Sequence, residues 1–274
     1  MQRSGIEWTD YTANPLRARN RRTGAVGHYC EHMSRGCQNC YAEGWNARTR
    51  GGYGTGLPYR PSSLDELELF VDGGVLAEVR GRRKPCRLFW CSMTDLALHV
   101  YSDSFRDKVL DVIDATPHIT HQVLTKRPEA LGAYLARRYA GRPLPASLWV
   151  GATVEDQDQA DRRLPALRGI PAAVRWLSCE PLLEAVRLDL DGVRWVVVGG
   201  ESGAGSRACE VAWVRGVVEQ CQAAAVKVFT KQLGDNAIAA TGERLRIGFK
   251  GKDIDRWPAD LRVREFLSSP PDVP

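Results

Sequence analysis

The sequence lacks the features that mark membrane, secreted and disordered proteins. No apolar run approaches the ~20 residues that span a bilayer, and the N-terminal stretch Met1-Gln2-Arg3-Ser4 lacks the apolar core of a signal peptide. No low-complexity stretch or linker divides the chain. We therefore expect a cytoplasmic protein without a membrane partner, folded as a single domain over residues 1–274.

What is present is an ordinary globular composition with a basic balance. The chain has 274 residues, of which 43% are apolar and 26% charged, which is enough to bury a sizeable core. The formal net charge is +5, and arginine outnumbers lysine. Basic residues gather in three clusters, which either contact phosphates or form a solvated surface. The clusters are Arg17, Arg19, Arg21 and Arg22; Arg80, Arg82, Arg83 and Lys84; and Arg137, Arg138 and Arg142.

Three of the eight cysteines are closely spaced and five are scattered. In a reducing cytosol, closely spaced cysteines are metal ligands or catalytic groups more often than disulfides. Four others lie in or beside apolar stretches and are expected to be small buried hydrophobes. These four are Cys86, Cys179, Cys209 and Cys221. Cys91 lies where a predicted strand ends, and its role stays open.

Short apolar, β-prone runs alternate with amphipathic segments from about residue 87 onward. The predicted strands are 87–91, 121–124, 148–150, 174–177, 195–198 and 226–230, with a first candidate at 5–8. Apolar residues recur at helical spacing in 104–116, after Pro128 and in 211–221. This alternation predicts parallel strands with right-handed crossovers. Six or seven such units favour an α/β fold with a partial or full (β/α) barrel, and an open doubly wound sheet is the alternative.

Polar or glycine residues follow nearly every predicted strand. They are Thr9 and Asp10, Ser92 to Asp95, Thr125 to Arg127, Gly151 to Glu155, Ser178 to Glu180, Gly199 to Gly203, and Lys231 with Gln232. Each alone could cap a helix. Because parallel α/β barrels build their sites from the loops after the strands, the repetition predicts a polar pocket for a zwitterionic, sugar-bearing ligand. Gly199 and Gly200 would let the backbone adopt positive φ and approach that ligand.

The strongest local motif is a loop with three cysteines, Cys30, Cys37 and Cys40, within residues 28–43. Thiolates suit zinc and iron–sulfur clusters. Three protein ligands on a four-iron cluster would leave one iron open for an outside molecule. The alternatives are a zinc site completed by His28 or His32, and three thiols without a metal. A helix-like segment, 41–50, follows the loop.

Much of the chain resembles a phage and bacterial family of unassigned function that has a three-cysteine cluster loop and is related to the radical S-adenosylmethionine (SAM) superfamily. The matching stretches are 6–10, 14–15, 36–43, 91–93, 122–128, 178–182, 198–203 and 257–266. The sequence departs from the superfamily pattern in two respects. Six residues separate Cys30 and Cys37, where three are usual, and Gly199-Gly200-Glu201 comes late in the chain.

The resemblance implies a radical SAM-type barrel of the TIM kind, with a [4Fe–4S] cluster on the three cysteines and a C-terminal extension over about 235–274. The open iron would bind SAM, and an electron would cleave it to a 5′-deoxyadenosyl radical. The residues implied for SAM are Ser92, Thr125, Lys126, Ser178, Glu180, Gly199, Gly200 and Glu201. The expected function is an enzyme acting on an unidentified substrate, with nucleic acid favoured, served by a reductase or other electron donor. The alternative is a non-catalytic iron–sulfur or zinc protein that binds nucleic acid or a host protein.

Overall fold

The computed structural model describes residues 1–48 and 54–267 and divides into two compact units, Met1–Trp149 and Val150–Pro274. Each unit is described by itself. Compact units can belong to one domain or to two, so the single domain over 1–274 stays a prediction. The last seven residues of the predicted C-terminal extension lie outside the described part. No helix among the described residues is long and apolar enough to cross a bilayer.

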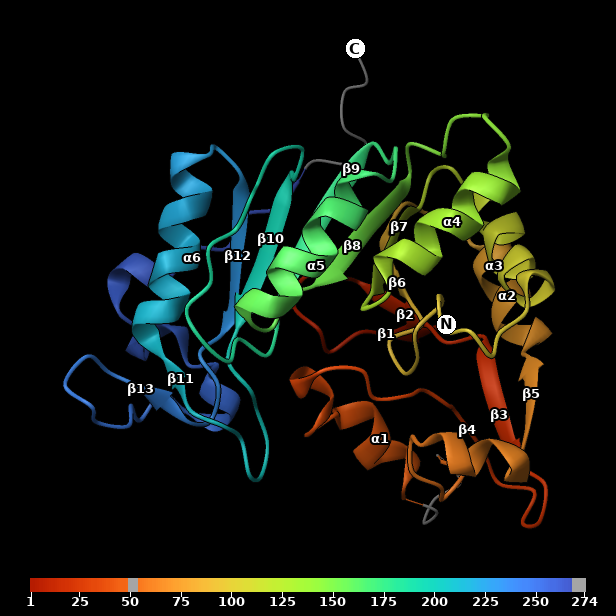
Figure 1. Ribbon diagram of the computed structural model, residues 1–274, viewed down its shortest axis with the longest axis horizontal. Coiled ribbons are helices and arrows are strands. Elements are labelled where there is room, and N and C mark those ends of the chain that lie inside the picture. The colour runs from red at the N-terminus through yellow and green to blue at the C-terminus, as the bar shows by residue number, and fades with distance from the viewer. Residues whose placement is uncertain (49–53, 268–274) are drawn as a thin grey trace. The chain divides into compact units, whose positions relative to one another are not determined.

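The first unit contains a sheet of mainly parallel strands (Figure 1). Its strands, in spatial order, are β1 (Gln2–Arg3), β2 (Tyr11–Ala13), β6 (Arg87–Trp90) and β7 (Thr120–Thr125). The β2–β6 and β6–β7 pairs are parallel, and the β1–β2 pair is antiparallel. The helices that follow β6 and β7 are α3 (Asp103–Ala115) and α4 (Pro128–Tyr139).

The predicted first strand at 5–8 is wrong. That segment forms a turn, closed by a 3.3 Å hydrogen bond from the Thr9 amide to the Ile6 carbonyl. Trp8 belongs to this turn and its side chain is buried, with its ring centroid 4.9 Å from that of Phe89. Its aromatic, β-prone side chain thus packs on the sheet without joining it. The strand that pairs with β6 is β2, three residues further on.

A second, antiparallel sheet in the first unit was not predicted. It has the order β4 (Val26–Gly27), β3 (Leu16–Asn20), β5 (Leu67–Val71). Between its strands the chain forms the 3-10 helix Arg35–Cys37, the helix α1 (Tyr41–Asn46) and the 3-10 helix Pro61–Glu66, and α2 (Gly73–Gly81) comes after β5. The helix predicted over 41–50 is confirmed as far as Asn46, while residues 49 and 50 lie outside the described part.

The second unit holds the later parallel strands. They are β8 (Leu148–Thr153), which begins at the unit boundary, β9 (Val174–Cys179), β10 (Trp195–Gly199) and β12 (Lys227–Gln232). β10 pairs in parallel with both β9 and β12. The helices are α5 (Gln157–Arg168) and α6 (Val211–Ala223). A small parallel pair, β11 (Cys209–Glu210) and β13 (Ala237–Ile238), and three 3-10 helices at Phe249–Gly251, Ile254–Arg256 and Ala259–Leu261 complete the unit.

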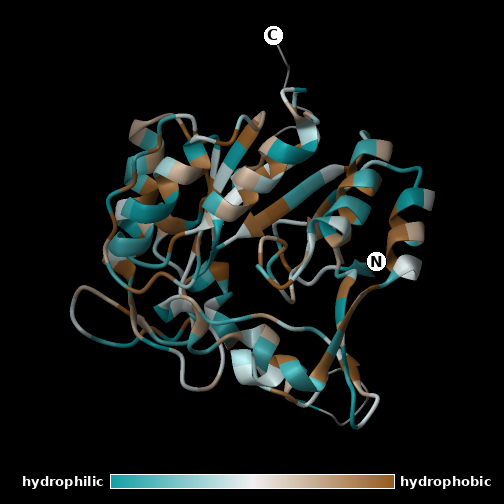
Figure 2. Ribbon diagram, turned by 45° about the vertical axis from the view of Figure 1, so that its right-hand side comes forward, coloured by the Kyte–Doolittle hydropathy of each residue, from teal (hydrophilic) through white to brown (hydrophobic). Residues whose placement is uncertain are grey.

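The α/β class is confirmed, with parallel strands in both units. Each of the six strands predicted after residue 87 is present. All residues of β8 and β10 are buried, as expected for parallel strands covered on both faces. The helices carry both hydrophilic and hydrophobic residues along their lengths, as Figure 2 shows. The core therefore comes from apolar strands and the inward faces of amphipathic helices.

Candidate functional site

The cysteine loop of the first unit is built around a short turn. The Cys37 amide bonds to the Ser34 carbonyl at 3.0 Å, and the Cys40 amide bonds to the Cys37 carbonyl at 3.2 Å. The Cys30 sulfur lies 3.9 Å from the Glu31 carbonyl oxygen, and the Cys37 sulfur lies 4.0 Å from the Ser34 hydroxyl. Both sulfurs therefore make long, weak contacts within their own loop.

Within residues 1–48 and 54–267, no three His, Cys, Asp or Glu side chains are grouped so as to hold a metal ion. The three thiols nevertheless act on one another electrostatically: Cys40 is coupled to Cys30 and to Cys37. Burial raises the pKa of Cys30 to about 12, with Asp95 adding to the shift and Arg127 opposing it. Burial also raises the pKa of Cys40. These two thiols are protonated at neutral pH, so any metal they bound would release protons.

A buried carboxylate, Asp95, holds the loops around the cysteines together. It accepts hydrogen bonds from the Thr125 hydroxyl at 2.7 Å and from the Lys126 amide at 2.9 Å. It also pairs with the Arg127 guanidinium at 3.1 Å, and Arg127 in turn donates to the Glu31 carbonyl at 3.1 Å. The loops after β6 and β7 are thereby tied to the cysteine loop. Asp95 and Arg127 belong to the predicted strand-end loops, but neither was singled out as a site residue.

Tyrosines fix the chain immediately before Cys30. The Tyr101 hydroxyl donates to the Tyr29 carbonyl at 2.9 Å, and the Thr94 hydroxyl donates to the same carbonyl at 2.5 Å. Tyr59 donates to the Met93 carbonyl at 2.9 Å. Tyr29 and Tyr101 are fully buried. The loop after β6 therefore holds in place the residue that directly precedes Cys30.

Ser92, which is predicted to contact SAM, is hydrogen-bonded to Asn14. The sequence analysis did not place Asn14 at a strand end, because it put the first strand at 5–8. Asn14 directly follows β2 at its carboxyl end, and its amide nitrogen donates to the Ser92 hydroxyl at 3.0 Å. The Met93 amide donates to the Asn14 side-chain oxygen at 3.1 Å. The matched stretch 14–15 was the only sequence signal for Asn14.

The placement of Thr9 and Asp10 with the other strand-end residues is wrong. The Asp10 carboxylate pairs with Arg87 at 3.0 Å, and Arg87 is the first residue of β6. Because β2 and β6 are parallel, Thr9 and Asp10 lie at the amino ends of these strands. The polar pair therefore stabilises the opposite edge of the sheet from Ser92 and Thr125.

The two histidines considered for zinc have other partners. His32 pairs with Glu43 at 2.7 Å, and the His28 Nδ1 atom lies 2.9 Å from the Leu16 carbonyl oxygen. Burial lowers the pKa of His28 to about 4. Neither position favours a fourth zinc ligand beside the three thiols.

The cysteines outside the loop differ in exposure. Cys179, Cys209 and Cys221 are buried, as predicted, whereas Cys86 is half-buried and the prediction for it is wrong, because it follows the charged residues Arg82, Arg83 and Lys84 in the irregular segment before β6. Cys91 is buried at the end of β6 with φ +58°, a left-handed conformation that few non-glycine residues adopt. Its thiol is electrostatically coupled to Cys30.

In the second unit, the carboxylates that follow the strands are paired with cations. Glu155 lies 2.7 Å from Arg163, both fully buried. Glu180 lies 2.8 Å from Lys231, and the Ser178 hydroxyl donates to Glu180 at 3.3 Å. Glu201 accepts from the Arg207 Nε at 3.0 Å and from its amide at 2.8 Å. For Ser178, Glu180 and Glu201 the implied contact with SAM stays a prediction.

The expectation that Gly199 and Gly200 adopt positive φ is wrong, since neither is among the residues with that geometry. Their backbone approaches the protein's own chain. A Cβ on Gly200 would lie 2.3 Å from the Leu233 carbonyl oxygen, and one on Gly199 would lie 2.9 Å from the Gln232 carbonyl oxygen. Close packing between β10 and β12 therefore accounts for both glycines.

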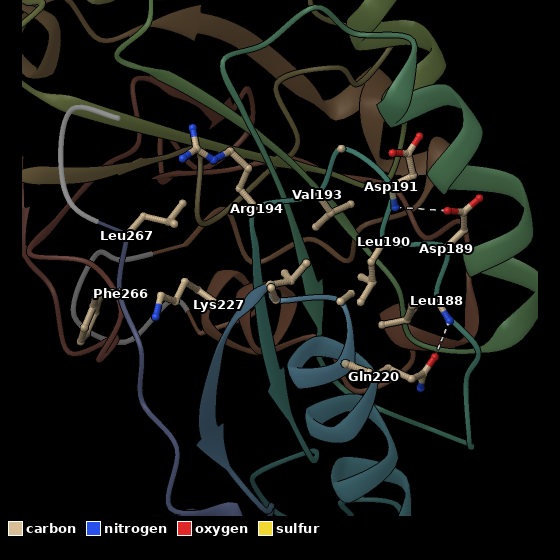
Figure 3. Close-up of a pocket in the computed structure, with 15 residues that line it drawn as sticks. Leu188, Asp189, Leu190, Asp191, Val193, Arg194, Gln220, Lys227, Phe266 and Leu267 are labelled. Carbon is tan, nitrogen blue, oxygen red and sulfur yellow. Dashed lines mark hydrogen bonds between the residues drawn. The ribbon is translucent and has the colours of Figure 1, made fainter. Parts of the chain in front are cut away.

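A cavity of about 900 Å³ in the second unit is not at the strand ends that carry these residues (Figure 3). It is lined by Arg194, which precedes β10, by Lys227, which begins β12, and by the loop 188–193. These are the amino ends of the strands, whereas α/β sites form at the carboxyl ends. A second cavity, about 440 Å³, lies beyond the carboxyl end of β12 and is lined by Gly234, Asp235, residues 244–248 and Arg256.

Two arginines of the predicted basic clusters have partners within the fold. Arg138 of α4 pairs with three carboxylates of α3, those of Asp107, Asp111 and Asp114, at 2.7–3.0 Å. The Arg82 guanidinium lies 4.2 Å from the centre of the Tyr11 ring. These arginines stabilise neighbouring elements, which does not favour the phosphate-binding interpretation for them.

Comparison with known proteins adds one match. No curated protein and no solved structure matches the chain. Residues 3–258 match the model of a family described as proteins of unknown function (DUF5131). Since this match covers most of the 274 residues, the chain belongs to the DUF5131 family.

Proposed function

We propose that the protein binds a [4Fe–4S] cluster through Cys30, Cys37 and Cys40 and acts as a radical SAM-like enzyme of the cytoplasm. The proposal includes the finer parts of the resemblance, namely a partial (β/α) barrel of TIM type and kinship with a phage and bacterial family related to the radical SAM superfamily. The observation that carries it is the geometry of the cysteine loop, in which the Cys40 amide bonds to the Cys37 carbonyl at 3.2 Å and the Cys30 and Cys37 sulfurs make weak contacts of 3.9 and 4.0 Å.

The chemistry of the donor set fits this cluster. Three thiols in one loop are the ligands that iron–sulfur clusters require. Ligation needs the Cys30 and Cys37 sulfurs to turn away from the Glu31 carbonyl and the Ser34 hydroxyl, and both contacts are weak enough to be given up. The cations of Lys126 and Arg127 oppose the raised pKa values of Cys40 and Cys30, and so favour their thiolate forms.

When bound, the cluster would supply the electron that cleaves SAM. Among the residues implied for SAM, Lys126 is best suited to bind the carboxylate of SAM, because its positive charge lies close enough to Cys40 to lower the pKa of that thiol. Thr125 and Ser92 act differently: their hydroxyls are bonded to Asp95 and Asn14, so they fix the loops. Glu180 and Glu201 could meet an ammonium group or ribose only by exchanging Lys231 and Arg207 as partners.

The decisive experiment is iron, sulfide and absorption analysis of anaerobically reconstituted protein, with and without SAM. We expect about four iron atoms per chain, equal sulfide and a broad visible absorption. Cys37→Ser should abolish the absorption, whereas the matched control Cys86→Ser should retain it because Cys86 lies outside the loop. Zinc at about one atom per chain without visible absorption would refute the cluster.

Catalysis is tested separately on the loaded protein. With a strong reductant it should convert SAM to 5′-deoxyadenosine, and Lys126→Met should weaken SAM binding while retaining iron. A loaded, reduced protein that binds SAM but leaves it intact with nucleic acid present would contradict the enzymatic part and leave a cluster-binding protein.

A further inference from the structure

Beyond β12, the second unit presents a basic turn whose residues the sequence analysis had not singled out. The turn comprises residues 244–252, in the blue segment of Figure 1, and its sequence is RLRIGFKGK. It is anchored at the carboxyl end of β12, because the Leu233 amide bonds to the Gly251 carbonyl at 3.2 Å and the Lys250 amide bonds to the Asp235 carboxylate at 2.7 Å. The buried Trp257 donates to the same Gly251 carbonyl at 3.0 Å.

The backbone of this turn is unusual. Gly248, Lys250 and Gly251 have φ values of +76°, +60° and +66°. A Cβ on Gly251 would lie 2.3 Å from the Gly234 carbonyl oxygen, so glycine is required there. Lys250 adopts a left-handed conformation that is uncommon for residues with a side chain. Such outliers persist where the surrounding contacts fix them, and here they direct Phe249 outward.

Phe249 is 82% exposed, the most exposed of the large apolar side chains in the described residues. The ammonium group of Lys250 lies 5.3 Å from the centre of its ring. Exposing a phenyl ring to water is unfavourable. An exposed ring beside a cation is a surface on which a nucleobase stacks.

Three arginines line the adjoining cavity of about 440 Å³. Arg244 donates from Nε to the Asp235 carbonyl at 3.0 Å, and Arg256 lies 2.9 Å from Asp253. Arg246 has no side-chain partner among the residues that the structure describes. The one carboxylate in the lining, that of Asp235, already accepts from the Gly203 and Lys250 amides. Three arginines thus face the carboxylates of Asp235 and Asp253, so the cavity keeps a net positive charge within the described residues.

We propose that this turn binds single-stranded nucleic acid, with Arg246 and Arg244 on backbone phosphates and Phe249 stacked on a base. Arginines alone would also suit an acidic peptide, but the exposed ring favours bases. A single strand is favoured over a duplex because the duplex hides its base faces. The inference names the substrate class of the proposed enzyme and in that sense rests on the proposed function, although the binding itself needs no cluster.

The test is fluorescence anisotropy of the full-length protein with a labelled single strand of about 16 nucleotides. The wild-type protein should bind with an affinity that falls as salt rises. Phe249→Ala should weaken binding about tenfold or more at all salt concentrations, and Phe249→Trp should restore it. Arg246→Ala should weaken binding and lower the salt slope by about one, and Arg246→Lys should recover the slope. The matched control is Arg194→Ala, which removes an exposed arginine at the amino end of β10 and should bind like wild type.

The inference would be overturned by no salt-dependent binding of the wild-type protein, by equal binding of a duplex and a single strand, or by Phe249→Ala and Arg246→Ala proteins that bind like wild type. Polyglutamate that competes as well as the single strand would assign the turn to acidic polymers and also overturn it. Iron content separates this test from the proposed function. Cys37→Ser should lose iron yet still bind the strand, and Phe249→Ala should retain iron.

Discussion

The polar side chains at the carboxyl ends of the strands are paired differently in the two units. In the second unit, the carboxylates after β8, β9 and β10 each pair with a cation of the same unit, as Glu155–Arg163, Glu180–Lys231 and Glu201–Arg207. In the first unit, one carboxylate, Asp95, gathers donors from two loops beside three thiols. Of these thiols, Cys30 and Cys37 make only contacts of 3.9 and 4.0 Å.

The difference shows what a polar residue at a strand end means. A charge that is balanced inside the fold stabilises the loop, whatever its position suggests, because a ligand would have to displace its partner. In the described residues of the first unit, Cys30 and Cys37 make weak contacts instead, and the coordination capacity of their sulfurs remains available. The same contrast separates Arg138 of α4, which meets three carboxylates, from Arg246, which meets none in the described residues.

The largest expected effect comes from breaking the most deeply buried pair of the second unit. Glu155→Gln leaves the Arg163 guanidinium buried without a countercharge, since both side chains are at most 2% exposed. We expect a loss of about 3–5 kcal/mol in the free energy of unfolding, measured by urea denaturation. Iron content after reconstitution should equal that of wild type. Loss of iron in a variant that is still folded would show that this edge takes part in cluster binding.

Lowering the pH tests the stability of the first unit, because all five histidines of the chain lie there. Burial lowers the pKa of His121 to about 4, and its Nδ1 accepts from the Trp90 indole at 3.0 Å, so the folded protein holds it neutral. Between about pH 6.5 and 4 the unfolded chain gains a proton there that the folded chain does not. Stability should therefore fall as pH drops through this window, by about 3 kcal/mol for this group.

The measurement is urea denaturation at several pH values for wild type and for His121→Gln. The substitution should flatten the decline between pH 6.5 and 4, since it removes one group whose pKa is lowered by folding. The decline should persist in the control His99→Gln, which replaces an exposed ring that is not among the groups acting on His121. Equal slopes for His121→Gln and wild type would contradict the buried, neutral imidazole.

Much of the α/β core was predictable because continuous apolar runs such as those of β8 and β10 are visible locally. The antiparallel sheet was not, since β3 pairs with β5 about 50 residues later and its alternation of Arg17 and Arg19 with Leu16 and Ala18 was interpreted as a charge cluster. The first strand was misplaced because Trp8 has the β-prone character of a strand residue but packs from a turn.

The candidate site was predictable only where its members are neighbours in sequence. Cys30, Cys37 and Cys40 could be identified from spacing alone. The pairing of Asp95 with Arg127, 32 residues away, depends on the packing of β6 against β7 and leaves no local pattern. For the same reason the exposure of Phe249 could not be anticipated, since it follows from three left-handed residues whose conformations tertiary contacts impose.

Asp95→Asn tests whether the carboxylate of the first unit positions the cysteine loop, in contrast to the paired carboxylates of the second unit. The amide keeps one acceptor oxygen but presents a donor to the Lys126 amide or the Arg127 guanidinium, which both donate to Asp95. We expect about 2 kcal/mol of destabilisation, together with a reduced iron content, because Arg127 would no longer be held against the Glu31 carbonyl. Denaturation and iron analysis report the two effects. A variant destabilised to this extent that retains full iron would show that Asp95 stabilises the fold without positioning the cysteine loop.

The smallest expected effect concerns Cys91, a fourth thiol beside the three of the cysteine loop. Cys91 is coupled electrostatically to Cys30, but it is fixed at the end of β6 by a 2.8 Å hydrogen bond from its amide to the Ala13 carbonyl. Its positive φ and its burial both leave it little freedom to reach a shared metal centre. Cys91→Ala should therefore cost about 1 kcal/mol of stability and leave iron and sulfide unchanged, while Cys40→Ala loses both. If Cys91→Ala also loses iron, the cluster has four protein ligands. No iron would then be open to SAM, and the first unit would hold a structural cluster.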